Sequence, residues 1–519
     1  MKNTINKTKI PPYVTRVTEN LEKAGFQAYI VGGCVRDLLI GREPKDWDVT
    51  TNATPDQIIS LFEKTVYENS FGTVAVVFQD LNSDTLDVSS ETSNFVSRET
   101  NSNVSSETDK NIVEVTPYRT ESKYSDSRHP DEVKFSKTLE EDLMRRDFTI
   151  NAMAYSVSGE TLVDLYKGQD DLKDKVLRTV GDAKERFGED ALRMLRAVRF
   201  SAQLGFGISH ETMMAIAELS ENITRISAER IRDEFEKMMM SPEPALAIGM
   251  LEKLGLLKHI IPELIEGVGC DQKGEHIYDV YEHLLHALQH AADKGWPLEV
   301  RLAALFHDIG KPRTRRWDGT KAGGKGKYTF YGHEVVGARM AQKIMERLKF
   351  PKKSTDLVVT LVRQHMFFSD TEAMTLSAVR RVVAKVGKEN IWTLMNIREC
   401  DRVGMKKKEA PYRLRKYHAM IEEVLRDPIS VGQLVVDGNI LMNELHMKPG
   451  PRMGWMLHAL LEEVLDDPKK NTREYLDKRV GELEKLSDED LKTLGEEAKK
   501  AKEDIEEAEV RELHKKHGV

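Results

Sequence analysis

The stretch of sequence that decides the fold is residues 32–51, GGCVRDLLIGREPKDWDVTT. Ala28–Val31, directly before it, is a short apolar run that predicts a strand, and Trp47–Val49 predicts a second strand. Asp46 and Asp48 are two residues apart, so on a strand their side chains project from one face. Mg²⁺ prefers such oxygen ligands, and two metal ions can activate a hydroxyl and stabilise a leaving pyrophosphate. The stretch therefore predicts a Mg²⁺-dependent phosphoryl-transfer site on a small sheet.

Three residues upstream of the aspartates are suited to phosphate. Gly32 and Gly33 permit close approach of the backbone and offer N–H donors to a triphosphate, and Arg36 adds a guanidinium fork. A plain turn followed by surface aspartates explains either short motif alone equally well. The whole stretch is more specific, because it resembles the motif of the class II tRNA nucleotidyltransferases and bacterial poly(A) polymerases, within the polymerase-β-like nucleotidyltransferases.

The resemblance covers roughly residues 13–257 and implies addition of nucleotides to an RNA 3′ end without a nucleic-acid template. The segment 145–154, RRDFTINAMA, matches the family's ribose-recognising motif. The resemblance implies that Arg146, Asp147 and Asn151 hold the ribose. Taken alone, the two arginines that open this segment are better explained as a solvated pair at a loop-to-strand junction.

A third catalytic carboxylate is expected on a later strand. Glu114, in VEVTPYRTE, fits the family pattern, and the match continues through Arg119. Asp87, in LDVSS, is the competing residue. The Ser/Thr/Asn-rich stretch at about 80–110 has the composition of a disordered or loosely held insertion, so the match to Glu114 must cross it.

A second constellation predicts how the base is chosen. Asp190 and Arg193 are three residues apart on a helix predicted to open at Glu189, so they share one face. A carboxylate accepts hydrogen bonds and a guanidinium donates them, which suits the amino group and ring nitrogen that cytosine and adenine both present. The segment matches the family's EDxxR motif, which implies that Glu189 orients Arg193, while Arg196 and Arg199 contact the incoming nucleotide. Ordinary surface ion pairs on a helix are the alternative.

The segment 124–142, YSDSRHPDEVKFSKTLEED, narrows the choice within the family. It resembles the flexible loop of CCA-adding members, which is associated with the switch from C to A addition. The resemblance implies that the chain adds CCA to the 3′ end of tRNA from CTP and ATP, releasing pyrophosphate, and that it holds the acceptor arm mainly through phosphates. A poly(A)- or A-adding enzyme on the same fold is the first alternative.

A third constellation predicts a second metal site. His307 and Asp308 are adjacent, follow the apolar helix Leu302–Phe306 and precede Gly-Lys-Pro. Mixed nitrogen and oxygen ligands suit a divalent transition metal. The pattern resembles the H…HD…D signature of the HD phosphohydrolase superfamily. The resemblance implies the ligands His283, His307, Asp308 and Asp401, to which two-metal members add residues in the positions of His333 and His365.

The role of such an HD site stays open between two alternatives. It hydrolyses 2′,3′-cyclic phosphates or trims phosphates at tRNA ends, or it is vestigial. If the HD site is the working centre and the N-terminal part only binds RNA, the chain is a metal-dependent phosphohydrolase. For an isolated histidine, a place in the core or on the surface is the simpler explanation.

Composition places these sites in a multidomain protein. The chain has 519 residues, of which 40% are hydrophobic and 32% charged, as expected for a helix-rich soluble protein. Its net charge of −8 does not exclude nucleic-acid binding, which needs only a local basic surface. The three cysteines predict neither a disulfide framework nor a zinc knuckle. With no signal peptide and no long apolar run, we expect a cytoplasmic protein without membrane contact.

We expect an α+β fold: a polymerase-β-like nucleotidyltransferase head with a small mixed sheet, then an all-helical neck, body, HD domain and tail. The charged segment after Asp466 predicts a solvated helix or partial disorder. The sequence does not specify the oligomeric state. The expected domains are the head at 13–165, the neck and nucleotide-selecting region at 166–262, the HD domain at 270–410, and the C-terminal helical body and tail at 428–519.

Overall fold

The structure is a computed structural model of the whole chain. It describes residues 5–68, 72–78, 111–121, 133–272, 277–318, 327–368, 374–405, 411–444 and 446–494. The expected insertion at about 80–110 and residues 124–132 of the expected flexible loop lie outside the described residues. The chain divides into two compact units, Met1–Ser227 and Ala228–Val519. This division falls inside the region 166–262, so the expected domain boundaries remain predictions.

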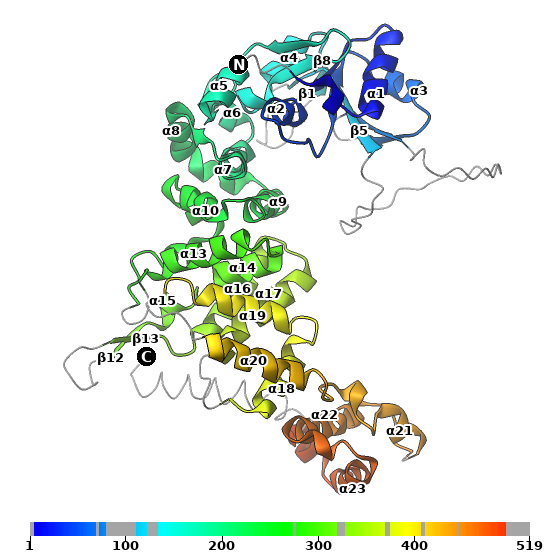
Figure 1. Cartoon of the computed structure of the whole chain (residues 1–519), viewed down its shortest axis with the longest axis vertical. Coiled ribbons are helices and arrows are strands. Elements are labelled where there is room, and N and C mark those ends of the chain that lie inside the picture. The colour runs from blue at the N-terminus through cyan, green and yellow to red at the C-terminus, as the bar shows by residue number, and fades with distance from the viewer. Residues whose placement is uncertain are drawn as a thin grey trace, which may run out of the picture. The chain divides into compact units, whose positions relative to one another are not determined.

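The first unit is built on a mixed sheet, as expected for an α+β fold (Figure 1). Among the described residues the sheet has seven strands in the order β3-β4-β5-β2-β1-β8-β9. Only the β2–β5 pair is parallel; the other neighbours are antiparallel. The strands are β1 Ala28–Val31, β2 Asp48–Thr51, β3 Thr65–Glu68, β4 Thr73–Val77, β5 Ile112–Pro117, β8 Met153–Ser156 and β9 Thr161–Asp164.

The sheet positions the expected site because its central strands are buried. Ile30, Val49 and Val115 are fully buried, which fixes the register of β1, β2 and β5. The strand β3 was not expected from the sequence. The remaining elements of the head are α1 Pro12–Lys23, α2 Gly33–Leu39, α3 Pro55–Leu61, α4 Leu139–Met144, the 3₁₀ helix Thr149–Asn151, and the two-stranded pair β6 Arg119–Glu121 and β7 Val133–Phe135.

Helices follow the head within the first unit. They are α5 Gly168–Asp174, α6 Ala183–Glu189, α7 Leu192–Leu204 and α8 His210–Leu219, with the short parallel pair β10 Val176–Leu177 and β11 Gly207–Ile208. The prediction that one helix opens at Glu189 is wrong, because Glu189 ends α6 and α7 begins at Leu192. Asp190 lies between them with an extended backbone, and its carboxylate accepts the Leu192 N–H at 3.0 Å. This local bond competes with helical hydrogen bonding and separates the two helices.

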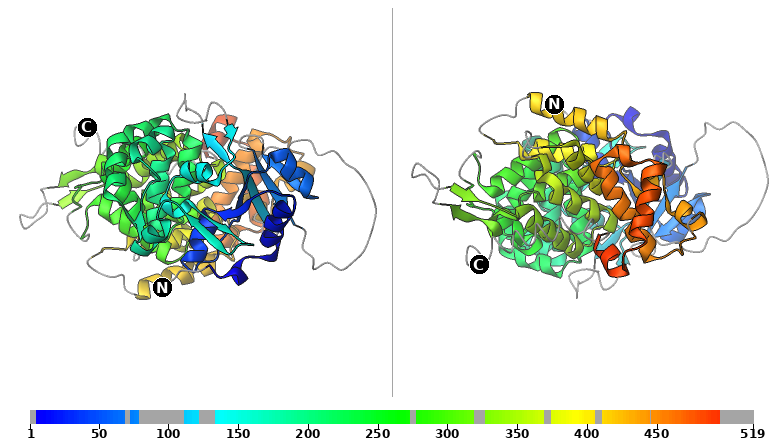
Figure 2. Two further views of the ribbon diagram at one scale, coloured as in Figure 1. Left: turned by 90° about the horizontal axis from the view of Figure 1, so that it is seen from above. Right: turned by 90° about the horizontal axis from the view of Figure 1, so that it is seen from below.

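The second unit is mainly helical (Figures 1 and 2). Its helices are α9 Ala228–Met239, α10 Pro244–Lys253, α11 Leu257–Ile260, α12 Pro262–Ile265, α13 Val280–Asp293, α14 Leu298–Phe306, α15 Lys311–Thr314, α16 His333–Arg347, α17 Lys352–Gln364, α18 Leu376–Val386, α19 Ile391–Asp401, α20 Pro411–Val424, α21 Gly438–Asn443, α22 Pro451–Asp466 and α23 Arg473–Leu483. The strands β12 Arg316–Asp318 and β13 Lys327–Thr329 form an antiparallel pair beside these helices.

The charged C-terminal segment is partly folded onto this unit. Leu476, Val480 and Leu483 of α23 are buried, and α22 and α23 lie side by side (Figure 2). Residues 473–483 are therefore a packed helix rather than a fully solvated one. No helix among the described residues is both long and apolar enough to cross a bilayer.

Candidate active site and metal centre

Two of the three carboxylates expected to bind metal, Asp48 and Glu114, lie on the parallel pair β2–β5. Asp48 and Glu114 are register partners there, and the Glu114 N–H donates to the Trp47 carbonyl at 3.0 Å. Register partners point to the same face of a sheet. The prediction that Asp46 also lies on the strand is wrong: β2 begins at Asp48, and the exposed Asp46 precedes it at a bend. Asp87 lies outside the described residues, so the choice of Glu114 remains a prediction supported by this register.

The electrostatics of Asp48 suit a cation. Burial and the neighbouring Asp46 raise the pKa of Asp48, whereas Arg146 opposes them. A carboxylate whose negative charge is disfavoured in this way gains from a nearby positive ion. Carboxylate oxygens are the ligands that a hard divalent cation such as Mg²⁺ prefers. Among the described residues, however, groups of three or more possible ligands lie only at the HD site.

Gly32 allows Arg146 to reach this carboxylate. Its φ is +82°, which favours glycine, and its N–H donates to the Met153 carbonyl at 3.2 Å. A Cβ added here would lie 3.0 Å from Nη1 of Arg146 and 3.8 Å from Oδ2 of Asp48. A residue without a side chain is therefore needed at position 32, where the Arg146 guanidinium passes the backbone.

Arg36 joins the expected phosphate-binding and ribose-binding residues. It is buried on α2 and donates from Nη1 to Oδ1 of Asn151 at 2.9 Å and from Nε to Oδ1 of Asp37 at 2.9 Å. Asn151 in turn donates to Oδ1 of Asp147 at 3.4 Å. Residues that the sequence assigns to triphosphate and ribose thus lie in one hydrogen-bonded group.

Asp147 connects this group to α7. The Nη2 of Arg196 lies 2.7 Å from Oδ2 of Asp147, and Oδ1 of Asp147 accepts the Phe148 N–H at 2.8 Å. Burial raises the pKa of Asp147, but Arg196 outweighs burial and the net pKa is lowered. Asp147 is therefore held as a carboxylate and fixes the orientation of Arg196.

Arg193 is held from three sides. It forms an ion pair with Glu189 and donates to the carbonyls of Arg186 at 3.1 Å and Arg145 at 3.2 Å. The prediction that Asp190 and Arg193 share one helix face is wrong, since Asp190 precedes α7, although the Arg193 N–H bonds the Asp190 carbonyl at 3.1 Å. The base-selecting roles of both side chains remain predictions.

Sequence reasoning missed Phe200. Its buried ring lies under three guanidinium groups, whose central carbons stand 5.3 Å (Arg36), 5.3 Å (Arg196) and 4.3 Å (Arg199) from the ring centroid. Cation–π attraction over one ring gathers arginines that would otherwise repel one another. Arg199 and Phe200 are adjacent in the sequence, but that pair alone gave no signal for Phe200.

Sequence reasoning also missed the role of Asp142. This fully buried carboxylate on α4 lies 2.7 Å from Arg145 and 3.2 Å from Arg146, and it accepts a hydrogen bond from the Thr50 hydroxyl at 3.3 Å. It thus holds Arg146, which in turn approaches Asp48. An acid four residues before an arginine on a short helix is common, so the sequence gave no reason to single it out.

In the second unit, the expected HD residues lie together. Nε2 of His283 is 3.1 Å from Nε2 of His307, and Nε2 of His333 is 3.2 Å from Nε2 of His365. Asp308 lies between the two pairs. Its Oδ2 is 3.4 Å from both His283 and His307, and its Oδ1 is 3.2 Å from His333 and 3.6 Å from His365.

The imidazole tautomers show that this cluster fits metal. The Nδ1 atoms of three rings face backbone carbonyls: His307 at 2.8 Å from Ala304, His333 at 2.7 Å from Phe330, and His365 at 2.6 Å from Val362. A carbonyl only accepts, so each Nδ1 carries the proton and each Nε2 of a neutral ring directs a lone pair inward. In the pair His333 and His365, two such lone pairs on neutral rings lie 3.2 Å apart and repel unless a cation lies between them, and metal–nitrogen distances of about 2.0–2.1 Å match that spacing.

The pKa shifts in the cluster also favour a bound divalent cation. Burial and His307 lower the pKa of His283 to about 3, so that ring is neutral. Burial also lowers the pKa of His307, but Asp308 and Asp401 outweigh it and raise the pKa to about 10. His307 therefore binds a proton tightly, and a divalent cation can take that place among the carboxylates.

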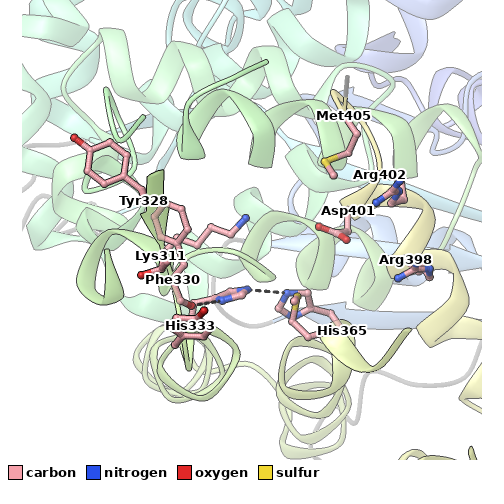
Figure 3. A pocket seen from close by; sticks show the side chains of 12 residues that line it. Lys311, Tyr328, Phe330, His333, His365, Arg398, Asp401, Arg402 and Met405 are labelled. Carbon is pink, nitrogen blue, oxygen red and sulfur yellow. Dashed lines mark hydrogen bonds between the residues drawn. The ribbon is translucent and has the colours of Figure 1, made fainter. Parts of the chain in front are cut away.

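Two groups of ligands can be distinguished, and they share one carboxylate. His283, His307, Asp308 and Asp401 form the first, and Asp308, His333 and His365 form the second. A cavity of about 360 Å³ reaches His333, His365 and Asp401 (Figure 3). Asp308 is fully buried behind it. The cavity is therefore lined by His333 and His365 of the second group and by Asp401 of the first.

Three family models match the chain in order. The poly(A) polymerase head domain matches residues 28–111 and 88–178, the probable RNA- and SrmB-binding site of polymerase A matches 205–267, and the HD domain matches 280–403. Together with the sheet and its carboxylates, these matches define a nucleotidyltransferase-type head followed by an RNA-binding region and an HD domain.

Known relatives narrow the class to one family. A CCA-adding enzyme of Lactobacillus delbrueckii subsp. bulgaricus is 31% identical over 462 residues, which are 88% of this chain and 94% of the relative. A CCA-adding enzyme of Leuconostoc mesenteroides is 42% identical over 233 residues, 45% of this chain and 50% of that relative. The chain belongs to the family of CCA-adding enzymes. With several curated relatives, the similarity spans only about half of their length.

A solved structure agrees with this membership. The CCA-adding enzyme of Bacillus stearothermophilus, crystallised in complex with CTP, superimposes with a TM-score of 0.63 at 26% identity. The match covers 92% of this chain and 100% of that one. The expected α+β architecture with its nucleotidyltransferase head and HD domain is confirmed.

Proposed function

We propose that the chain adds CCA to the 3′ end of tRNA by transferring CMP and AMP from CTP and ATP, with release of pyrophosphate. The observation that carries the proposal is the hydrogen bond from Arg193 to the Arg145 carbonyl, 3.2 Å long. It joins the EDxxR segment to the ribose motif, and Arg146 in turn approaches Asp48. These contacts support one continuous site for base selection and phosphoryl transfer within the first unit.

The reaction is attack of the tRNA 3′-hydroxyl on the α-phosphate of the bound nucleotide. Asp46, Asp48 and Glu114 would hold the Mg²⁺ ions, which would activate the hydroxyl and neutralise the developing charge when bound. Arg36 and the backbone at Gly32–Gly33 steady the triphosphate. In-line attack of the 3′-hydroxyl on the α-phosphate then depends on how rigidly the chain holds the tRNA end and the nucleotide.

Arg146, Asp147 and Asn151 hold the ribose in this proposal. Arg36 and Asn151 already form one hydrogen bond, so a nucleotide bound to either residue is positioned by the other. The guanidinium groups of Arg196 and Arg199, gathered over Phe200, add positive charge toward the nucleotide.

Asp190 and Arg193 select the base. Cytosine and adenine each offer an amino donor to the carboxylate and a ring-nitrogen acceptor to the guanidinium, whereas guanine and uracil present the opposite pattern. A mismatched base leaves buried polar groups unpaired, which costs about 1–3 kcal/mol for each group. The ion pair with Glu189 keeps Arg193 in the orientation in which its guanidinium can donate to the ring nitrogen of the base.

The proposed polynucleotide partner is the acceptor arm of tRNA. The match of residues 205–267 to an RNA-binding model supports this partner. The CCA-adding enzyme from Thermotoga maritima, whose structure is a complex with tRNA, has a similar fold, with a TM-score of 0.51 at 16% identity. Shape and phosphate contacts suit a partner whose sequence varies from one tRNA to the next.

The test is incubation with tRNA lacking CCA, together with CTP and ATP, followed by sequencing of the 3′ ends. Products ending in CCA support the proposal. CC, single-A or poly(A) products point to the alternatives on the same fold. The Asp46→Ala, Asp48→Ala double variant is the control, and tRNA extension by that variant overturns the catalytic assignment.

We also propose that the HD site is a metal-dependent phosphohydrolase acting on RNA ends, with two divalent transition-metal ions. The sharing of Asp308 by two ligand groups favours this second activity, because a metal pair can bind both the attacking water and the phosphate. In the reaction, water adds to phosphorus, the bond from phosphorus to a ribose oxygen breaks, and that oxygen leaves as a hydroxyl with a proton from the water. Phosphatase activity that survives loss of Asp46 and Asp48 but not His307→Ala supports it. Activity that survives both changes contradicts it.

A further inference from the structure

Phe200 of α7 lies where three arginines of the proposed nucleotide site come together. Its ring is buried, and the central carbons of Arg36, Arg196 and Arg199 lie 5.3, 5.3 and 4.3 Å from the ring centroid. Arg36 comes from α2, directly after the glycine pair, whereas the other two arginines come from α7 itself. The ring is therefore a common partner for positive charges from two separate motifs.

The Phe200 ring is itself packed against the ribose motif. The fully buried Phe148 lies against it with ring centroids 5.8 Å apart and nearly perpendicular ring planes, at 85°. Phe148 directly follows Asp147, whose carboxylate pairs with Arg196 at 2.7 Å. Close packing of two buried rings restricts the orientation of both. The ring over which the arginines gather is thus held in place by the segment expected to hold the ribose.

A neutral ring differs from a carboxylate as a partner for arginine. The negative face of the aromatic ring attracts a guanidinium, and this attraction is stronger where water is excluded. Because the ring has no net charge, the arginine keeps its positive charge available to an anion. Arg36 and Arg199 are buried, and Nη2 of Arg36 lies 3.6 Å from the position of a Cβ added to Gly33. Positive charge is thus held beside the backbone that is proposed to bind phosphate.

We propose that Phe200 is a positioning residue for nucleotide addition: its ring gathers Arg36, Arg196 and Arg199 into one positively charged group that receives the triphosphate of the incoming nucleotide. Without the attraction of the ring, the like charges repel one another and must be brought together whenever a nucleotide binds, which weakens binding. This role rests on the proposed function of the first unit, because it takes CTP and ATP as the ligands.

A purely structural role for Phe200 makes a different prediction. If the side chain only fills space in the core, any ring of nearly the same shape serves equally well. Fluorine atoms on a phenylalanine ring withdraw electron density from its faces and change its size little, so they weaken cation–π attraction without removing the packing. A series of fluorinated phenylalanines at position 200 therefore separates the two roles.

Calorimetric titration of the full chain in excess Mg²⁺, without tRNA, tests the proposal, since no nucleotide is consumed under these conditions. The probes are CTP, ATP and inorganic triphosphate. Replacement of Phe200 by phenylalanine with one, two or three ring fluorines should weaken binding of all three probes in steps, reaching about 3- to 30-fold at three fluorines. The three-fluorine ring at Phe187, fully buried on α6 and outside this arginine group, is the matched control and should change nothing.

The outcomes separate this role of Phe200 from the proposed function. Unchanged or tighter binding along the series, or equal weakening by fluorination of Phe187, overturns the role. Weakened CTP and ATP with unchanged inorganic triphosphate also overturns it, because the ring would then act on the base or the ribose. Stepwise weakening in a chain that adds no nucleotide to tRNA supports the role and contradicts the proposed function. CCA addition by a chain whose binding does not follow the fluorine series supports the function and overturns the role.

Discussion

Arg196 lies 2.7 Å from the buried carboxylate of Asp147, and this ion pair ties α7 to the ribose motif. Asp147 is 8% exposed at its side chain and Arg196 is 34% exposed. Loss of the arginine would leave a buried negative charge without its main partner. The pair is therefore a structural connection as well as part of the proposed nucleotide site.

Arg196→Ala should lower the free energy of unfolding by about 3 kcal/mol, because an uncompensated charge remains buried. Urea denaturation measures this change. The control is Arg178→Ala, which breaks an ion pair with Asp171 at 3.4 Å whose arginine is 48% exposed; that loss should be below about 1 kcal/mol. Equal effects of the two changes would contradict the importance assigned to the Asp147 pair.

The stability of the first unit should fall in acid through Asp142 and Asp147. Burial raises the pKa of both carboxyls, but Arg146 and Arg196 respectively outweigh it, so both pKa values are lowered on folding. A lowered pKa adds stability above the unfolded value of about 3.9, and that stability is lost as pH falls through the folded value. Asp142→Asn should flatten the decline in Tm below about pH 4. An unchanged slope would refute this origin.

Arg193→Ala should relax base choice more than it weakens metal binding. Incorporation of GMP and UMP relative to CMP and AMP should rise by at least about 10-fold, since the unpaired-group penalty disappears. Glu189→Gln should raise this incorporation ratio by less than Arg193→Ala does, because it weakens the ion pair that holds Arg193 but keeps the arginine. Sequencing of 3′ ends made with all four nucleotides gives the ratios. Unchanged selectivity in Arg193→Ala would disprove base selection by this residue.

Gly32→Ala should abolish most nucleotide addition, because the new Cβ occupies the path of the Arg146 guanidinium. Backbone strain at a positive φ also costs about 1–2 kcal/mol. Gly41→Ala separates the two effects: Gly41 has a φ of +79°, but nothing lies within 4 Å of an added Cβ. Both variants should lose similar stability in denaturation, while only Gly32→Ala loses addition rate. Similar rates would show that the close approach is unimportant.

Asp308→Ala should remove both HD-site metal ions, whereas His365→Ala should remove one. The reason is that Asp308 belongs to both ligand groups and His365 to the second alone. Elemental analysis of the purified protein should give about two ions per chain for the parent, as expected for a shared carboxylate between two sites. Retention of one ion by Asp308→Ala would argue that the groups are independent. Addition of CCA should be unaffected in both variants.

Local signals in the sequence predicted some of the individual elements. The strand Ala28–Val31 has the expected bounds, because a compact apolar run between a helix and a glycine pair leaves little freedom. The helix that precedes His307 was also expected from the apolar run Leu302–Phe306, although α14 begins earlier, at Leu298. HD residues far apart in the sequence lie together because α13, α14 and α19 pack on one another.

The bounds of an element were predicted wrongly where a side chain bonds to a nearby backbone group. Site residues were missed where their contacts form only through packing of distant segments. The sequence pattern around Asp190 looks helical, but its hydrogen bond to the Leu192 N–H ends one helix and precedes the next. Asp46 lies in a bend that ends before β2 begins at Asp48. Neither Phe200 under its arginines nor Asp142 between Arg145 and Arg146 could be inferred, because those contacts exist only after the sheet and α7 have packed.

The antiparallel pairing of β4 and β5 has a consequence for how such a chain can vary. Val77 and Ile112 are register partners, so the two ends of the connection between these strands stand side by side. Closing a loop between fixed neighbours costs only about 0.6 kcal/mol more for each doubling of its length. Glu114 therefore keeps its place beside Asp48 whatever the length of that connection. Insertions and deletions can accumulate there during evolution with little penalty to the catalytic geometry, which makes this hairpin a natural point for lineage-specific additions.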